Sequence, residues 1–365
     1  MPDIAATPAF ARAWRQSIAG EISGRVLPFW QARGFDENGG IIGRLTNDLR
    51  AGNEPRTALL AAEMVWVFSR AARVLRKPEY ARLAEQAYAT LNLAYVDHHY
   101  GGVFYAVDDA WRPSDDHKHI PSQMMAILAL VEFYRAGGKL AEQALEQAKD
   151  IFGLAAPFAA DGIPRDREWR VIPNAAADAA NSRVRAVGAF AALAAEWRNP
   201  APKVALLALA NAITQQKPTG KNTALELETS WQMSEAAPLG DARFAKQVRA
   251  FALEMAGAVL RDGIGKDNIL RDGAGMNEHI WRTQTEGVIG FYNAYQLSGD
   301  ARFLHASRTC WNVIEQFFID YSNGEWFKTL NKHWQASPDA LKIGPTLGPF
   351  HQARMGFEMM ERLGN

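Results

Sequence analysis

The chain has 365 residues, of which 48% are hydrophobic and 22% charged, and its 40 basic side chains match its 40 acidic ones in number. This balance provides no global field that would attract nucleic acid or an acidic membrane. One cysteine, Cys310, excludes an intramolecular disulfide framework and a cysteine metal cluster. The first residues carry charges at Asp3, Arg12 and Arg15, and no segment approaches the ~18 apolar residues of a membrane span. We therefore expect a cytoplasmic protein with neither nucleic acid nor a membrane as partner.

Apolar residues recur at helical spacing along the chain. Residues 78–95, "PEYARLAEQAYATLNLAY", have an apolar face opposite a charged one, and Pro78 lies where a helix start tolerates proline. Residues 123–138, "QMMAILALVEFYRAGG", are apolar nearly all round and end at a Gly-Gly pair, which is typical of a buried helix. Residues 286–300 and 309–321 show the same periodicity. Because no segment shows convincing strand alternation, the pattern predicts an all-α protein.

Glycine-containing turns interrupt the helical pattern at steps of roughly 40 to 60 residues. Such steps fit two helices plus their connections, so the pattern predicts helical hairpins, and six of them can close into a ring. The alternative is that these glycines merely end unrelated helices. Short apolar-aromatic stretches follow several turns ("GGIIGRL", "GGVFYAV", "NGEWFKTL"), which favours repeated loops on one face. Since no linker or composition shift appears, we predict a single domain over residues 1–365.

Several motifs resemble those of the N-acylglucosamine 2-epimerase superfamily, which includes cellobiose epimerases and aldose-ketose isomerases. They occur in collinear order: "NGGIIGRLTND", "LLAAEMVWVFSRA", "HKHIPSQMMAILALVEFY", "LELETSWQMSEAA", "HIWRTQTEGVIGFYNAYQLSGD", "NGEWFKTL" and "GPFHQARM". The resemblance runs from about Gly39 to Met355. It implies an (α/α)6 barrel with a pocket at one end, which agrees with the hairpin count.

The resemblance also implies chemistry on reducing sugars, in which the proton beside the carbonyl leaves through an enediolate and returns to the other face or the neighbouring carbon. Two proton-transfer groups must then flank a planar intermediate. Histidine suits this role because its free pKa of ~6.5 lies near working pH. His351 matches the family's histidine in the closing block.

The other histidines of the family pattern are missing. Leu225 occupies the position of the general base, and leucine cannot carry a proton. Arg183 and Arg185 fall where a His-x-His pair is expected, and arginine stays charged at ordinary pH. Further replacements affect sugar-binding positions: Glu63 for an arginine, Pro121 for a tyrosine, Arg282 for a tryptophan and Thr346 for a stacking tryptophan.

A carboxylate could replace the lost base, because burial can raise the pKa of a glutamate into a useful range. The candidates are Glu63, Glu226 and Glu228. Residues two apart on a helix point to different faces, so one of Glu226 and Glu228 should face inward, and the family pattern favours Glu228. Our predicted catalytic residues are therefore His351, Glu228 and Glu63.

The added arginines favour a small, anionic or modified sugar, since a guanidinium binds carboxylate, phosphate or sulfate in a fork. The alternative is that these arginines only balance buried glutamates. The predicted substrate-binding residues are Arg44, Gln123, Asn181, Arg183, Arg185, Trp281, Arg282 and Glu286. No dinucleotide fingerprint, phosphate loop or metal-ligand spacing appears, so we expect no cofactor and no metal.

Three functions remain open from the sequence. The first is an epimerase or isomerase with altered catalytic residues, the second a hydrolase or lyase that uses carboxylates on the same barrel. The third is a non-catalytic sugar-binding descendant. A homodimer is possible, as in relatives. The remaining loop histidines are expected to be solvated: His98, His99, His117 and His119.

Overall fold

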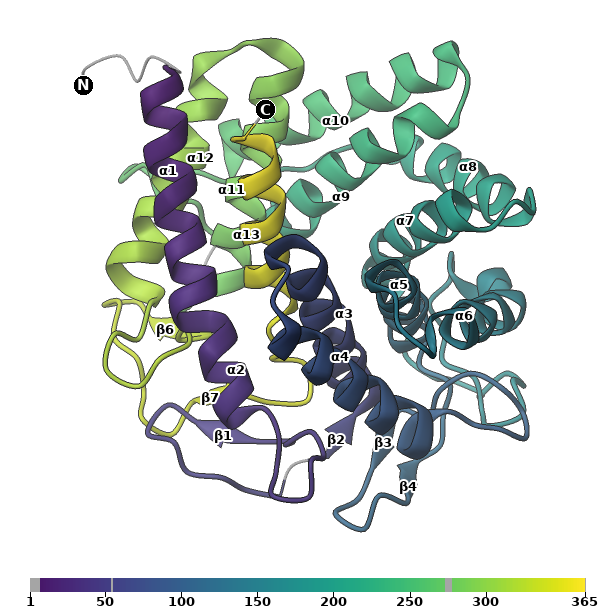
Figure 1. The fold of residues 1–365 in the computed structure, drawn as a ribbon. Helices are drawn as coiled ribbons and strands as arrows, with labels where there is room; N and C mark the ends of the chain where they lie inside the picture. The colour runs from purple at the N-terminus through teal and green to yellow at the C-terminus, as the bar shows by residue number, and fades with distance from the viewer. Residues whose placement is uncertain (1–6, 54, 273–277, 365) are drawn as a thin grey trace.

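The computed structural model describes residues 7–53, 55–272 and 278–364, and these form two concentric rings of helices (Figure 1). The inner ring consists of α3 (Ala58–Leu75), α5 (Ile120–Ala136), α7 (Ala179–Glu196), α9 (Thr223–Ala236), α11 (Trp281–Ser298) and α13 (Phe350–Arg362). Each inner helix packs on the next, and α13 packs on α3 to close the ring. The outer helices are α1 (Pro8–Glu21), α2 (Leu27–Arg33), α4 (Pro78–Thr90), α6 (Ala141–Ala155), α8 (Ala201–Thr214), α10 (Ala242–Asp262) and α12 (Ala301–Val313). The predicted all-α class and the (α/α)6 barrel are confirmed.

Shorter elements complete the fold. Single helical turns are η1 (Ile22–Val26), η2 (Leu91–Tyr95), η3 (Ala156–Phe158), η4 (Ala237–Leu239) and η5 (Ile314–Phe318). Small antiparallel sheets pair β1 (Leu45–Thr46) with β7 (Leu341–Ile343), β2 (Arg56–Thr57) with β3 (Ala106–Val107) and β4 (Pro113–Asp115), and β5 (Glu278–Ile280) with β6 (Thr329–Asn331). These sheets join loops that are far apart in the sequence. They lie mainly at one end of the barrel, where Figure 1 shows most of the strands.

The turn spacing predicted six helical hairpins but did not predict which two helices form the sixth. Five of them are consecutive inner-outer pairs: α3 with α4, α5 with α6, α7 with α8, α9 with α10 and α11 with α12. The sixth pair joins the two ends of the chain, because α13 packs against α1. Closure of the ring therefore depends on a contact between segments more than three hundred residues apart, which local sequence cannot specify.

Burial follows the predicted periodicities. Helix α5, apolar nearly all round, buries every residue from Ile120 to Phe133 except Leu128. In the amphipathic α4, by contrast, Tyr80 and Ala84 are buried while Arg82 is exposed. Among the described residues, no helix combines the length and the apolar character that a membrane span requires.

Three of the loops at the glycine turns share one arrangement. In each of the three, an aspartate at the turn accepts backbone N–H groups and also pairs with a basic side chain 20 to 22 residues later. The three pairs are Asp36–Arg56 (2.6 Å), Asp97–Lys118 (2.9 Å) and Asp320–Lys342 (2.8 Å). These three loops therefore repeat one arrangement, and the charge pair that fixes each is buried in the second and third and half-buried in the first.

We expect Lys118→Met to destabilise the protein by up to about 3–5 kcal/mol, because the buried Asp97 carboxylate then keeps only the half-exposed Arg167, 3.1 Å away, as a cationic partner among the described residues. Burial alone would raise the pKa of Asp97, but the Lys118 hydrogen bond and the turn N–H groups lower it to about 2. A depressed pKa contributes stability above the unfolded value of about 4, and this contribution is lost as pH falls from there toward 2. Urea unfolding at pH 7 measures the loss, which should shrink in acid.

The matched control for Lys118→Met is Arg112→Ala, which breaks an exposed loop pair with Asp108 at 2.9 Å. Exposed pairs contribute roughly 0–1 kcal/mol. Equal destabilisation by the two substitutions would contradict the role given to the buried pair.

Candidate active site

A cavity of about 410 Å³ opens at the end of the barrel where the inner helices begin. Every inner helix contributes to its wall from its first two turns. The contributions include Leu59 of α3, Pro121 of α5, Asn181 of α7, Leu225 of α9, Arg282 of α11 and His351 of α13. Because helix N-termini carry unpaired N–H groups and the positive end of the helix dipole, this end of the barrel has a positive potential that favours anions.

His351 lies in the wall of this cavity and is 4% exposed. Its Nδ1 is 2.8 Å from Oε1 of Glu286. Since a carboxylate only accepts, this contact places the ring proton on Nδ1 and makes Nε2 the accepting nitrogen. Burial, reinforced by the charge of Arg282, lowers the pKa of His351 to about 4. At neutral pH the ring is therefore uncharged and able to take a proton.

A cluster of charged groups lies beneath His351. Nη2 of Arg354 donates to Glu228 at 2.7 Å and to Glu286 at 2.8 Å. Nη2 of Arg282 donates to the other oxygen of Glu228 at 2.6 Å. Burial opposes ionisation of Glu228, but the two guanidinium charges hold its pKa well below the ordinary range. Glu228 faces inward as predicted, yet its geometry suits an anchor for two arginines better than a proton-transfer group.

Glu228, Glu286 and His351 place one potential metal-ligand atom each within 4.8 Å of one another. The guanidinium of Arg354 lies within hydrogen-bond distance of both carboxylates. A divalent cation bound here would have to displace a buried positive charge from its partners. The guanidinium of Arg354 therefore already serves as the cation between these two carboxylates, and the three groups do not fit a metal ion.

Four predicted binding residues line the cavity: Asn181, Arg185, Trp281 and Arg282. Asn181 accepts from Arg282 at 3.3 Å, and Trp281 Nε1 donates to Gln352 at 3.1 Å. Arg185 is less engaged. Its Nη1 contacts the sulfur of Met125 at 3.5 Å, and its Nη2 is 3.9 Å from Glu63.

Glu63 is buried behind the loop that precedes α13. A Cβ at Gly348 would come within 2.0 Å of its Oε2, so only glycine lets this backbone lie over the carboxylate. Burial raises the pKa of Glu63 to about 7, with Arg185 and Lys328 acting in the opposite direction. Among the described residues, its Oε2 has no hydrogen-bond partner. Glu63 is thus partly protonated near neutral pH, and Arg185 is only partly neutralised.

Other predicted site residues have structural roles away from the cavity wall. The amide of Gln123 bonds both the N–H and the C=O of Val103, which holds the turn before β3. Arg183 donates to the carbonyl of Ala160 because residues two apart on α7 point in different directions. The side chain of Arg44 packs over Gly52. None of these three is among the described residues that line the cavity, so their assignment to substrate binding is corrected.

Glu226 is also occupied elsewhere. Its carboxylate accepts from the backbone N–H groups of Thr219 and Gly220 and from the Thr219 hydroxyl. It therefore fixes the turn before α9 and is not among the described residues that line the cavity. This agrees with the expectation that only one of Glu226 and Glu228 faces inward.

Two residues of the site were missed. Arg354 follows His351 by three positions, so helical spacing puts both on one face, and this signal was available in the sequence. His119 was predicted to be a solvated loop residue without a role, and the structure places it, half-buried, directly before α5 in the cavity wall. Its position at the start of a buried helix was the signal that could have indicated it.

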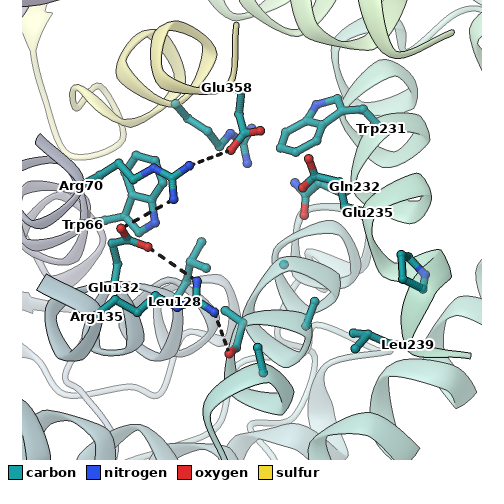
Figure 2. Close-up of a pocket in the computed structure, with 16 residues that line it drawn as sticks. Trp66, Arg70, Leu128, Glu132, Arg135, Trp231, Gln232, Glu235, Leu239 and Glu358 are labelled. Atoms are coloured by element: carbon teal, nitrogen blue, oxygen red, sulfur yellow. Dashed lines mark hydrogen bonds and ion pairs between the residues drawn. The ribbon is translucent and has the colours of Figure 1, made fainter. Parts of the chain in front are cut away.

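A second cavity, of about 330 Å³, lies among the C-terminal halves of the inner helices (Figure 2). Ion pairs cross its wall: Arg70 lies 3.7 Å from Glu132 and 3.5 Å from Glu358, and Arg135 lies 3.7 Å from Glu132. Arg354 connects the two cavities, because its side chain lines the second one and also donates to the carboxylates beneath His351. The histidine-bearing cavity is therefore the better candidate for chemistry.

The structure is thus an (α/α)6 barrel with a buried histidine–carboxylate pair in the cavity at the N-terminal ends of its inner helices. The sequence matches the model of the N-acylglucosamine 2-epimerase (GlcNAc 2-epimerase) family over residues 40–237 and 223–345. The chain belongs to this family, and the resemblance predicted from the motifs is confirmed.

Individual relatives agree with this assignment. The cellobiose 2-epimerase of Ruminococcus albus is 28% identical over 94% of this chain and 98% of its own length. The structure of cellobiose 2-epimerase from Bacillus thermoamylovorans superposes with a TM-score of 0.87 at 25% identity, covering 96% of this chain and all of that one. A D-mannose isomerase at 15% identity and a TM-score of 0.77 shares the fold over 98% of this chain and 99% of its own. The family and these relatives support an enzyme of the sugar epimerase and isomerase class.

Proposed function

We propose that this enzyme moves the proton beside the carbonyl of a small sugar in the cavity at the N-terminal ends of the inner helices. The observation that carries the proposal is the position of His351, in the cavity wall with its Nδ1 held by Glu286. This arrangement supplies an uncharged imidazole whose Nε2 can accept a proton from carbon.

Removal of that proton leaves an enediolate, whose negative charge develops on oxygen. Six helix N-termini converge on the cavity and Arg282 lines it, and such fixed dipoles and charges stabilise an oxyanion without reorganising. The sugar would therefore lie with its carbonyl end toward these groups and its carbon toward His351.

We further propose that the sugar carries a negative charge, which Arg185 recognises. Arg282 and Arg354 are compensated by Glu228 and Glu286. Among the described residues, the ion-pair partner of Arg185 is Glu63 at 3.9 Å, whose raised pKa weakens it as an anion. Of the arginines at 183, 185 and 282, Arg185 is therefore the cavity-lining one whose charge is least compensated.

The proposed function is tested with a panel of neutral, carboxylated and phosphorylated aldoses and ketoses in D2O. The expected result is deuterium at the carbon beside the carbonyl, together with an epimer or an aldose-ketose pair. Unsaturated products or new reducing ends would instead indicate a lyase or a hydrolase. Thermal stabilisation by a sugar that shows neither exchange nor turnover would indicate a binding protein.

We expect Arg185→Gln to lower kcat/KM for an anionic substrate by about 10- to 100-fold, since a hydrogen bond to a charged group contributes about 1.5–3 kcal/mol. For a neutral analogue the loss should be a few-fold at most. The matched control is Arg183→Gln on the same helix, whose side chain bonds Ala160 outside the cavity and should affect neither substrate. Equal losses on anionic and neutral substrates would rule out charge recognition by Arg185.

A further inference from the structure

We infer that His119 is the second proton-transfer group of this site and acts on the face of the bound sugar opposite to His351. The inference rests on the proposed function and goes beyond it, because it assigns a base that the sequence pattern lacks. Leu225, at the position where the resemblance places the base, presents only hydrocarbon to the cavity.

The two histidines stand on separate walls of one cavity. His119 immediately precedes α5, and His351 lies in the first turn of α13. Helix α3 lies between these helices in the ring, packs against both, and contributes Leu59 to the wall between them (Figure 1). A planar intermediate held in this cavity can therefore be approached from two directions.

The surroundings of His119 are typical of a functional group. Its ring packs against Tyr105, with centroids 4.8 Å apart, so one side is fixed. Its Nδ1 is buried and, among the described residues, has no hydrogen-bond partner. His119 is half-buried as a whole, so the accessible part of the residue lies away from Nδ1, which leaves Nε2 as the nitrogen for proton transfer.

The charged groups around His119 permit it to lose and gain a proton. Burial lowers its pKa, the carboxylates of Asp178 and Asp115 act to raise it, and Arg185 acts to lower it. Asp178 and Asp115 come from the segments before α7 and α5, and Arg185 from α7 itself. Burial is the largest of these influences, so the pKa of His119 lies below its ordinary value, and the two carboxylates limit the shift.

Other titratable groups near the cavity are committed elsewhere. Asp178 accepts from Asn181 at 3.0 Å, and Asp272 lies 3.3 Å from the hydroxyl of Thr223. Glu228 is held by two arginines. Among the described residues that line the cavity, His119 and His351 are therefore the imidazoles free to face a sugar.

The proton balance is complete without a co-reactant. His351 takes the proton as the C–H bond breaks, and the electron pair enters the enediolate. Protonated His119 then gives its N–H proton to the other face of the same carbon. At the end His351 is protonated and His119 is neutral, the reverse of the starting state. Proton exchange with water then restores the starting state of both.

The test compares His119→Asn with the wild type on the sugar that the panel identifies, in D2O. Epimer formation is expected to fall by at least about 100-fold, within the range attributed to a single acid-base group. One of the two epimers has its C–H bond directed toward His351. In the variant this epimer should still exchange that proton with D2O, because His351 alone removes and returns it. The thermal midpoint should not fall, since Nδ1 loses no partner.

The matched control is His117→Asn, because His117 is exposed, lies two residues away and has its Nδ1 3.1 Å from Asp115. It should retain wild-type turnover. If His119→Asn does not fold, His119→Gln takes its place. Epimer formation within threefold of wild type, or loss of exchange with both epimers, would overturn the role of His119 while leaving the proposed function standing. If the wild type exchanges no sugar proton at all, the proposed function itself fails, and this inference with it.

Discussion

Replacing His351 with asparagine is expected to lower kcat by about 10²- to 10⁴-fold while the protein remains folded, because one proton-transfer group contributes a factor of this size. Asparagine keeps a side-chain donor for Glu286, so the contact that Nδ1 makes at 2.8 Å has a substitute. Initial rates on the identified sugar measure the loss, and circular dichroism with thermal unfolding checks the fold. Full turnover in this variant would falsify the assignment of His351.

The same residue sets the expected pH profile. Burial and Arg282 lower the pKa of His351 to about 4, so the ring is already unprotonated at pH 6. On the acid side of the profile, and in the direction in which His351 is the base, kcat/KM should fall as pH drops through about 4. A fall centred near the ordinary histidine value of about 6.5 would show that burial does not govern its titration. The acid range must be measured with short incubations, since the Asp97 pair also weakens there.

Replacing Arg354 with methionine is expected to destabilise the protein by about 3–5 kcal/mol, because the change leaves two buried carboxylates without their shared cation. Glu228 would still pair with Arg282. Among the described residues, Glu286 would keep its hydrogen bonds with Trp231 and His351, which are uncharged at pH 7. Urea unfolding at pH 7 measures the loss. Activity should fall as well, because Glu286 orients the imidazole.

The pH dependence of this loss has a definite sign. In the wild type the pKa of Glu228 is held low, so its pairing stabilises the fold above the unfolded value of about 4.3 and is lost in acid. Without Arg354 the carboxylate is easier to protonate, so the difference in stability between variant and wild type should be largest at neutral pH and should narrow as pH falls.

Arg302→Met is the control. Arg302 of α12 pairs with Asp300 at 2.6 Å, and its side chain is 79% exposed. Because exposed pairs contribute little to stability, this control should unfold close to the wild type. An equally small loss for Arg354→Met would mean that the two carboxylates do not depend on the guanidinium.

The candidate site could be predicted only in part, and particular residues show why. Helical spacing predicted that one of Glu226 and Glu228 faces inward, because that distinction depends on one helix alone, and the family pattern selected Glu228. The same reasoning could have separated Arg185 from Arg183 on α7, but the family register directed attention to both. Gln123 was assigned to substrate because its type and motif fitted, whereas the structure uses its amide to hold Val103.

The sequence by itself determined the two-layer helical architecture, since apolar spacing along each segment decides which face is buried and glycine turns decide where helices end. It also located His351, whose motif stands at a helix start. Tertiary structure alone decided that His119 shares a cavity with His351, that Arg354 joins two carboxylates, and that the pKa of Glu63 rises to about 7. The physical reason is that desolvation and charge pairing act between side chains brought together from distant segments by closure of the ring, and no local pattern contains those distances.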